Sequence, residues 1–389
     1  MDYKIKLGIS GLIVLAVIIS SNSTVYLSLL PGQQAFNTNF KDDGINSKAD
    51  SLKIGFFPNL NHAQAIIGIG KVTFNNFFNN LSDSKGFSLQ PQLFSSGQSM
   101  LEALYAGKID AAYVDASSII QGFMLLGENE FRIVSGAASG GASFVVRNDS
   151  GIEAISDLGG KVFATPHLGG IHDVALRKYL IDNGFNTIKN GGNITVINLK
   201  PIDIISKFQN KEIDGAWVPE PIVAILKHQG NGEIFVDERD LWPGGEFISS
   251  NIIVRTDYLE HNPDVIKKLL EAHVNETIWL KQMLSNSNST GTHYSQNESN
   301  MAASAFSKGL MNITGKTLTE NQLVDAMSRI EYTWNPLADS LLKISEDSKD
   351  LGYIIKAFDW NDKLLKMYDL TILNKVLAEN KLKQIEPIQ

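Results

Sequence analysis

Six short loops in the sequence carry residues that can hydrogen-bond a small molecule, and each lies between a predicted strand and a predicted helix. The first three read "FPNLNHAQ", "SSGQS" and "VDASS", and the other three read "TPHLGGIHD", "LKPIDI" and "VPEPI". In an open α/β sheet, the helices that follow the carboxyl ends of the strands point unpaired N–H groups into a crevice. The six loops therefore predict a ligand-binding cleft.

Short polar side chains and glycines dominate these loops. The side chains that can donate or accept hydrogen bonds are Asn59, Asn61, His62, Ser96, Gln98, Ser117, Ser118 and His172. Backbone amides can approach a ligand closely at Gly97, Gly169 and Gly170, which have no side chain. Each polar residue could instead cap its helix, and Asn59 or Asn61 suits the start of the first one. Trp217 could wall the cleft or lie in the core of its strand.

The charges on the loops favour a ligand with mixed chemistry. Asp115, Asp173 and Glu220 lie on the loops, and Lys200 is the one basic side chain among them. A plain anion would have to rely on helix dipoles and amide donors against these carboxylates. A solute with an amine as well as an anionic head fits better. Glu220 could instead start its helix or pair with Arg239.

Three of the seven histidines suggest an alternative function. His62, His167 and His172 all fall on the predicted loops. If they met across a closed cleft they could bind a metal ion and serve a metal-dependent enzyme. The sequence has no hydrolase elbow, P-loop, HExxH motif or dinucleotide fingerprint, so we expect neither catalysis nor a cofactor.

Composition excludes several classes of protein. The chain has 389 residues, a net charge of −8 and no cysteine. Its acidic balance argues against a nucleic-acid surface, which needs clustered Lys and Arg. Without cysteine there are no disulfides, thiolate metal sites or cysteine nucleophiles.

The N-terminus predicts export. Lys4 and Lys6 precede the apolar run "LGISGLIVLAVII". We interpret residues 1–31 as a signal peptide or an uncleaved membrane anchor, and residues 32–51 as a polar tether. The protein is therefore expected to be extracytoplasmic, at the cell surface or in the periplasm.

An internal repeat predicts a two-lobed α/β fold. "GKIDAAYVDASSII" at 107–120 resembles "KEIDGAWVPEPIVA" at 211–224, and the aspartates Asp110 and Asp214 lie 104 positions apart. Three strand–helix units occur twice in the same order, which is typical of parallel sheets. We predict lobe 1 over 52–140, lobe 2 over 141–247, and a return to lobe 1 over 248–389. Two extended hinge crossings connect the lobes, and a helical C-terminal tail is expected to wrap lobe 1.

The sequence resembles the sulfonate/nitrate/taurine family of ABC-importer solute-binding proteins. The similar stretches include "KIGFFPNLNHAQAIIG", "SGQSMLEALYAGKIDAAYV", "GGKVFATPHLGGIHDVALRKYL" and "FVDERDLWPGGEFISSNIIV", and they lie within residues 52–285. The resemblance implies a periplasmic-binding-protein type 2 fold. It also implies a non-catalytic monomer that passes a sulfonate-, taurine- or nitrate-like solute to a membrane permease and a cytoplasmic ATPase. A sensory binding module is a further alternative.

The resemblance also implies a set of ligand contacts. The family's contacting loops match residues 58–62, 96–98, 115–117, 140–143, 168–172 and 217–220. This adds Pro58, Gly141, Ser143 and Leu168 to the candidates above.

Overall fold

Two β-sheets organise the protein in its computed structural model, which describes residues 51–71, 73–78, 87–284, 296–315, 318–354 and 360–388. The predicted export segment, and the tether as far as residue 50, lie outside the described residues. In the described part, no helix is long and apolar enough to cross a membrane. Residues 49–389 form one compact unit.

Lobe 1 is built around a six-stranded sheet with the order β11-β4-β10-β3-β1-β2. Its strands are β1 (Ser51–Phe56), β2 (Ser88–Leu93), β3 (Ala111–Asp115), β4 (Phe131–Gly140), β10 (Ile248–Arg255) and β11 (Ile330–Tyr332). Helices α1 (Ala63–Gly70), α2 (Thr73–Phe78), α3 (Gly97–Tyr105) and α4 (Ala116–Leu126) connect the first strands. The stretch "NHAQAIIGIGKVTFNNFF" at 61–78, whose sequence predicts a single helix, therefore contains two helices.

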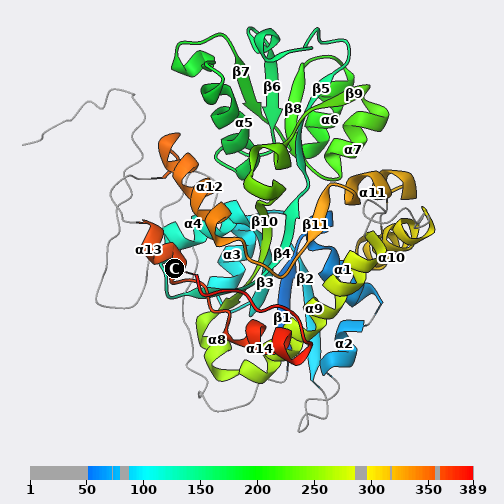
Figure 1. The fold of residues 1–389 in the computed structure, drawn as a ribbon, viewed down its shortest axis with the longest axis vertical. Helices are drawn as coiled ribbons and strands as arrows, with labels where there is room; N and C mark the ends of the chain where they lie inside the picture. Colours follow the sequence, from blue (N-terminus) through cyan, green and yellow to red (C-terminus); the bar gives the residue numbers. More distant parts are fainter. Residues whose placement is uncertain are drawn as a thin grey trace, which may run out of the picture. The chain divides into compact units, whose positions relative to one another are not determined.

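Lobe 2 is built around a five-stranded sheet with the order β7-β6-β8-β5-β9. Its strands are β5 (Ala142–Arg147), β6 (Val162–Thr165), β7 (Thr195–Asn198), β8 (Gly215–Pro219) and β9 (Gly232–Asp237). Its helices are α5 (Ile171–Asp182), α6 (Pro201–Gln209) and α7 (Ile222–Gln229). The chain enters lobe 2 at residues 140–142 and returns to lobe 1 through residues 238–247 (Figure 1).

The internal repeat is visible in atomic detail. Asp110 Oδ2 accepts a hydrogen bond of 2.9 Å from Lys53 N–H on β1, and Asp214 Oδ2 accepts one of 2.8 Å from Val162 N–H on β6. Arg255, at the end of β10, lies 3.5 Å from Asp110, and Arg147, at the end of β5, lies 3.4 Å from Asp214. Each aspartate thus joins the first parallel strand of its lobe to the antiparallel strand that crosses from the other lobe.

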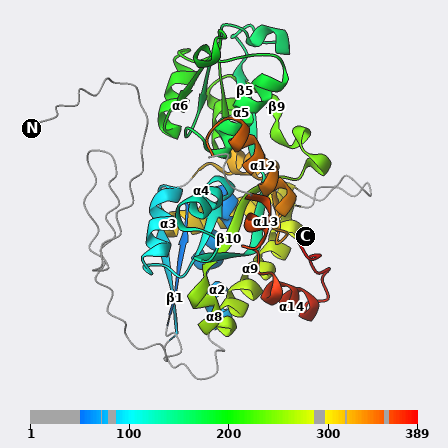
Figure 2. The same ribbon diagram turned by 90° about the vertical axis from the view of Figure 1, so that its left-hand side faces the viewer.

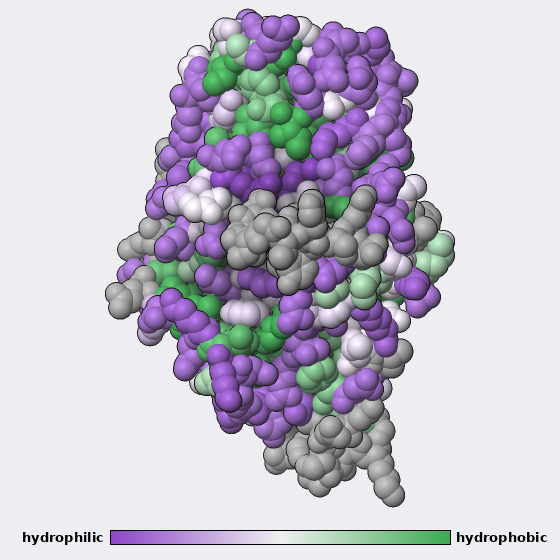
Figure 3. Space-filling view, turned by 45° about the vertical axis from the view of Figure 1, so that its right-hand side comes forward, coloured by the Kyte–Doolittle hydropathy of each residue, from purple (hydrophilic) through white to green (hydrophobic). Residues whose placement is uncertain are grey.

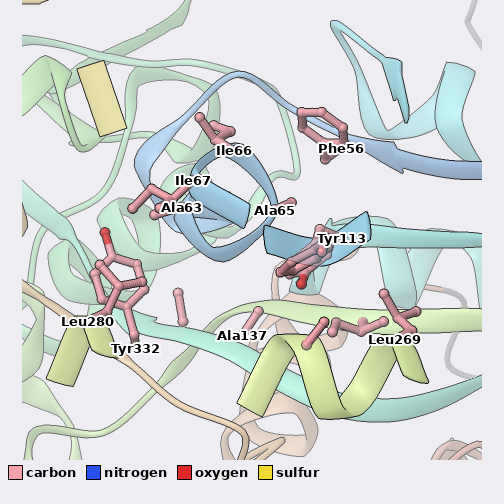
Figure 4. Close-up of a cluster of buried hydrophobic side chains, with 14 of the residues drawn as sticks. Phe56, Ala63, Ala65, Ile66, Ile67, Tyr113, Ala137, Leu269, Leu280 and Tyr332 are labelled. Carbon is pink, nitrogen blue, oxygen red and sulfur yellow. The ribbon is translucent and has the colours of Figure 1, made fainter. Parts of the chain in front are cut away.

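Apolar side chains cover both faces of the lobe 1 sheet. On one face, α1 packs against the sheet and against α9 (Pro263–Leu284), with Phe56, Ile66 and Leu269 fully buried (Figure 4). On the other face, α3 and α4 bury Met100, Ile119 and their neighbours. The α1 helix also meets α10 (Gln296–Thr314) closely, since a Cβ on Gly70 would lie 2.4 Å from Gly309 Cα. These contacts fix where the first ligand loop emerges from the sheet.

The C-terminal tail does more than wrap lobe 1. Helices α9, α10 and α14 (Thr371–Glu379) pack on lobe 1, as expected. In contrast, α11 (Glu320–Met327) also contacts α7, and α12 (Ala338–Asp350) also contacts α5, both in lobe 2. Figures 1 and 2 show α12 lying between the lobes, beside α5. The tail therefore spans both lobes.

Candidate functional site

The first loop of lobe 1 presents a neutral histidine. His62 ends the short 3₁₀ helix η1 (Leu60–His62), and its Nδ1 accepts a hydrogen bond of 2.8 Å from Phe57 N–H. Its ring stacks on Phe57 with the ring centroids 5.1 Å apart. Burial lowers the pKa of His62 to about 3, against the attraction of Asp115. The ring is therefore uncharged near neutral pH, with its proton on Nε2.

The asparagines of this loop do not cap helices. Asn59 is the residue before η1 but makes no side-chain capping bond, and His62 rather than Asn61 precedes α1. The Oδ1 atoms of both asparagines are buried and lack a hydrogen-bond partner among the described residues. Asn61 Oδ1 lies 3.2 Å from where a Cβ on Gly141 would stand, so it faces the first crossing. Buried acceptors without a partner are costly unless a ligand or water supplies a donor.

The second and third loops are organised by their own helices. Ser96 Oγ accepts from Ser99 N–H at the start of α3. Asp115 caps α4, where its Oδ1 accepts from Ser118 N–H at 2.9 Å and also from the Ser117 hydroxyl. A Cβ on Gly97 would lie 1.7 Å from Ser118 Oγ, so glycine allows the two helix starts to meet. For Ser96 the capping interpretation is confirmed, and Asp115 is a cap that the sequence analysis did not predict.

Three predicted contacts present exposed side chains. Pro58 and Leu168 are exposed, and so is Gln98, which bonds Glu102 on the next turn of its own helix at 3.0 Å. Local pairing thus engages the Gln98 amide.

The first crossing joins the loops of both lobes. Gly140 and Gly141 adopt φ values of 78° and 76°, a conformation that favours glycine. Gly141 N–H donates to the Arg329 carbonyl oxygen at 2.8 Å, and its own carbonyl accepts from Glu220 N–H at 2.8 Å. Just beyond, Ser143 Oγ is buried without a partner within the described part of the chain.

In lobe 2, the first loop is held by a buried carboxylate. Asp173 accepts hydrogen bonds from Thr165, Gly169 N–H, Arg177, Asn198 and Tyr353. Burial by itself would raise the pKa of Asp173, but these bonds outweigh it and hold the pKa below its usual value. Asp173 thus stays ionised and fixes the loop that carries Gly169, Gly170 and His172.

His172 reaches back toward lobe 1. Burial lowers its pKa to about 4, while the charge of Asp115 acts in the opposite direction. The charge of Asp115 therefore acts on a histidine in the first loop of each lobe.

Glu220 is paired, although not with the partner considered from the sequence. Its side chain is buried and bonds Arg329 Nε, and its Oε2 accepts from Ala224 N–H at 3.2 Å. Arg239 instead binds Asp237, with Nη2 at 2.6 Å from Oδ2. Burial raises the pKa of Glu220, and the charge of Arg329 opposes this rise. The proposed Glu220–Arg239 pair is wrong, because Arg329 lies nearer.

Trp217 belongs to the core of lobe 2, which corrects its assignment to the cleft wall. The indole is fully buried and stacks on Phe144 with the centroids 5.5 Å apart. Its Nε1–H donates to Glu238 Oε2 at 2.6 Å. Desolvation in this core raises the pKa of Glu238 to about 7.

The three loop histidines do not form a metal site. Across the described ranges, no group of three or more His, Asp or Glu side chains is placed to hold a metal ion. His62 is buried beneath Phe57 and Tyr113, whereas His167 is exposed. The positions of these histidines therefore do not support the alternative of a metal-dependent enzyme that uses them.

Sequence reasoning missed three residues around these loops. Ser250 on β10 pairs with Asp115 on β3, and its hydroxyl is buried with no partner in the described structure. Arg329 and Tyr353 come from the tail and contact Glu220 and Asp173. The serines of "FISSNII" were a usable signal for Ser250, but no local pattern marks the two tail residues.

A groove of about 1330 Å³ lies on another part of the molecule. It is lined by α5, the second crossing, α12 and the last residues of the tail, including Tyr179, Trp242 and Trp334. Several of its charges are already paired, such as Lys178 with Asp182 and Lys343 with Asp347. Figure 3 shows one face of the molecule, where hydrophilic side chains cover much of the surface and hydrophobic side chains gather in smaller patches. The unpartnered oxygens of Asn59, Asn61, Ser143 and Ser250 lie on or beside the loops and not in the groove.

Comparison with known proteins assigns the family. A model described as the NMT1-like family matches residues 46–291, which is more than half of the chain. The chain belongs to the NMT1-like family. The match spans the loops of both lobes and ends before Arg329 and Tyr353.

Curated relatives of this NMT1-like protein are binding proteins. It is 25% identical over 191 residues to a putative binding protein of Brucella abortus, covering 49% of this chain and 56% of that one. It is 26% identical over 212 residues to the taurine-binding periplasmic protein of Escherichia coli, covering 52% and 63%. The matched part thus spans little more than half the length of these relatives.

The fold has a solved counterpart. The periplasmic aliphatic sulphonate binding protein SsuA of Escherichia coli superposes with a TM-score of 0.65 and 16% identity, covering 88% of this chain and 96% of that one. The predicted two-lobed α/β fold and the resemblance to sulfonate, taurine and nitrate binding proteins are therefore confirmed.

Proposed function

We propose that this protein is the extracytoplasmic solute-binding subunit of an ABC importer, without catalytic activity. The observation that carries the proposal is the convergence of strand-end loops from both lobes on buried oxygens that lack partners among the described residues. Asn61 Oδ1 faces Gly141, and Ser143 Oγ and Ser250 Oγ are buried on the strands beside these loops. Contacts from both lobes to one solute would stabilise the closed form by population shift.

The same atoms favour a solute that carries N–H donors. Asn59 Oδ1 and Asn61 Oδ1 are acceptors, and a carboxylate, Asp115, lies near His62 and His172. The starts of α3, α4 and α5 supply backbone N–H groups and a favourable dipole for an anionic head. A small zwitterion of the taurine kind satisfies both requirements, and the taurine-binding relative supports this choice. Neutral histidines allow the solute to bind without competing positive charge.

The remaining partners follow from the proposal. A membrane permease and a cytoplasmic ATPase would take the solute from the closed protein, which would act as a monomer. The sequence of residues 1–31 would export the protein or anchor it outside the cytoplasm.

Titration calorimetry tests the proposed site and the solute class together. Taurine is compared with ethanesulfonate, which lacks the amine, and with nitrate. We expect taurine to bind more tightly than either, and Asn61→Leu to weaken taurine binding about tenfold or more, since a buried acceptor is lost. Asn183→Ala, in the groove, is the matched control and should leave the affinity unchanged. A folded protein that binds none of these solutes contradicts the solute class, and an effect at Asn183 alone contradicts the site.

A further inference from the structure

Two loops of lobe 2 are each held by one side chain of the C-terminal tail. Tyr353 holds the loop before α5, and Arg329 holds the loop before α7. Asp325 supports Arg329 from one helical turn earlier, at 2.8 Å. We call Asp325, Arg329 and Tyr353 the tail clamp. All three lie beyond the region that matches the family model.

The first contact covers the loop that carries Gly169. Tyr353 O–H donates to Asp173 Oδ2 at 2.6 Å. Its ring lies against Gly169, where an added Cβ would be 3.3 Å from the ring carbons. The apolar part of the contact is Ile171 at the start of α5, which belongs to the lobe 1 cluster formed with Leu341 and Ile344 of α12.

The second contact is an ionic network between α7 and α11. Asp325 accepts from Lys227 Nζ at 3.0 Å and pairs with His228 Nε2 at 3.0 Å, both from lobe 2. Arg329 bonds Glu220 at the other end of the network. An apolar residue also contributes to this contact, because Ala224 of α7 is fully buried in a cluster with Leu323 and Met327 of α11.

These contacts join the two lobes in the protein that has no solute bound. Each combines a charged hydrogen bond with the burial of one apolar side chain of lobe 2 in a lobe 1 cluster. Together they involve the loops that carry Gly169, His172 and Glu220, the candidate ligand contacts of lobe 2. An apparent dissociation constant equals the intrinsic one divided by the fraction of molecules in the competent state. Contacts that hold the lobes together before binding therefore raise the affinity.

We propose that the tail clamp holds lobe 2 against lobe 1 in the solute-free protein and sets the fraction of closed molecules. The clamp positions the lobe 2 loops; it is not a ligand contact. Only its consequence for affinity rests on the proposed function, because lobe separation is a property of the free protein.

Spin-label distance measurements on the solute-free protein test the clamp. The chain has no cysteine, so Lys189→Cys in lobe 2 and Glu260→Cys in lobe 1 place one label on each lobe at exposed positions. The clamp is weakened by Tyr353→Phe and by Asp325→Asn, which keep the side-chain shapes. Tyr258→Phe is the matched control, since its hydroxyl bonds the Ser51 carbonyl within lobe 1.

We expect each clamp variant to shift the distances toward open forms and to lower the closed-to-open ratio about tenfold or more, as loss of a hydrogen bond to a charged group requires. The control should match the parent. Taurine affinity should fall in proportion to the closed fraction. An unchanged distance distribution with a lowered unfolding midpoint would overturn the proposal, because the contacts would then stabilise the fold only. If no variant binds solute, the proposed function fails while the distances still decide the clamp.

Discussion

The two lobes share one framework but hold their ligand loops differently. In both lobes an aspartate, Asp110 or Asp214, joins the first parallel strand to the crossing strand with nearly the same bond lengths. In lobe 1, Asp115 bonds Ser117 and Ser118 of its own helix. In lobe 2, the corresponding Glu220 accepts from Ala224 N–H of its own helix and also bonds Arg329, which lies 109 positions away.

The difference separates self-supporting loops from dependent ones. A loop held by its own helix keeps its shape wherever the lobe moves. A loop that the tail also bonds loses part of its support when the tail and lobe 2 separate. Lobe 1 therefore offers a half of the site that is held within the lobe, and lobe 2 offers a half whose support depends in part on the position of the lobes.

Breaking the buried ion pair of lobe 2 should have the largest effect. Arg329→Met leaves the carboxylate of Glu220 buried without its cation, and we expect the free energy of unfolding to fall by about 3–5 kcal/mol. Arg239→Met is the control, because its pair with Asp237 is partly exposed and should cost no more than about 1 kcal/mol. Urea denaturation measures both. Equal losses would show that Glu220 does not depend on the tail.

Acid should act through His62 and Glu238 with opposite signs. His62, in lobe 1, has a folded pKa of about 3, below its unfolded value of 6.5, so the unfolded chain takes up the proton first and stability falls as the pH drops below 6.5. Glu238, at the end of lobe 2, has a folded pKa of about 7, above its unfolded value of 4.5, so stability rises as the pH falls from 7 toward 4.5. Each effect is on the order of 1.4 kcal/mol per pH unit within its window.

Two variants separate these contributions. Between pH 6.5 and 5, roughly where both windows overlap, His62→Phe should lose less stability on acidification than the parent, and Glu238→Gln should lose more. Unfolding free energies measured across this range give the slopes. Curves parallel to that of the parent would contradict the opposite contributions of His62 and Glu238.

Loss of a local cap in lobe 1 should have the smallest effect. Asp115→Ala removes the acceptor for Ser118 N–H, which we expect to cost about 1 kcal/mol. Because this cap is independent of the tail, its cost should add to that of Tyr353→Phe to within about 0.5 kcal/mol. Thermal unfolding of both single variants and the double variant measures the sum. A strongly non-additive result would show that lobe 1 also depends on the clamp.

Much of the framework could be predicted from the sequence because its signals are local. The repeat around Asp110 and Asp214 predicted two equivalent lobes, and Gly107 and Gly184 follow the ends of their helices with positive φ, which glycine favours. The helix predicted over 61–78 was wrong only in being continuous, since the structure has α1 and α2 there. Asn59 and Asn61 remain predicted ligand contacts, and the alternative that they cap a helix was wrong.

By itself the sequence determined the order of strands and helices, the loops that follow them and the local cap at Ser96, because each depends on residues close together in the chain. Only the tertiary structure decided that Arg329 and not Arg239 pairs with Glu220, that Trp217 faces the core, and that Tyr353 reaches Asp173. Partners more than 100 positions apart meet through the packing of α11 and α12 on lobe 2, which no periodicity or motif encodes.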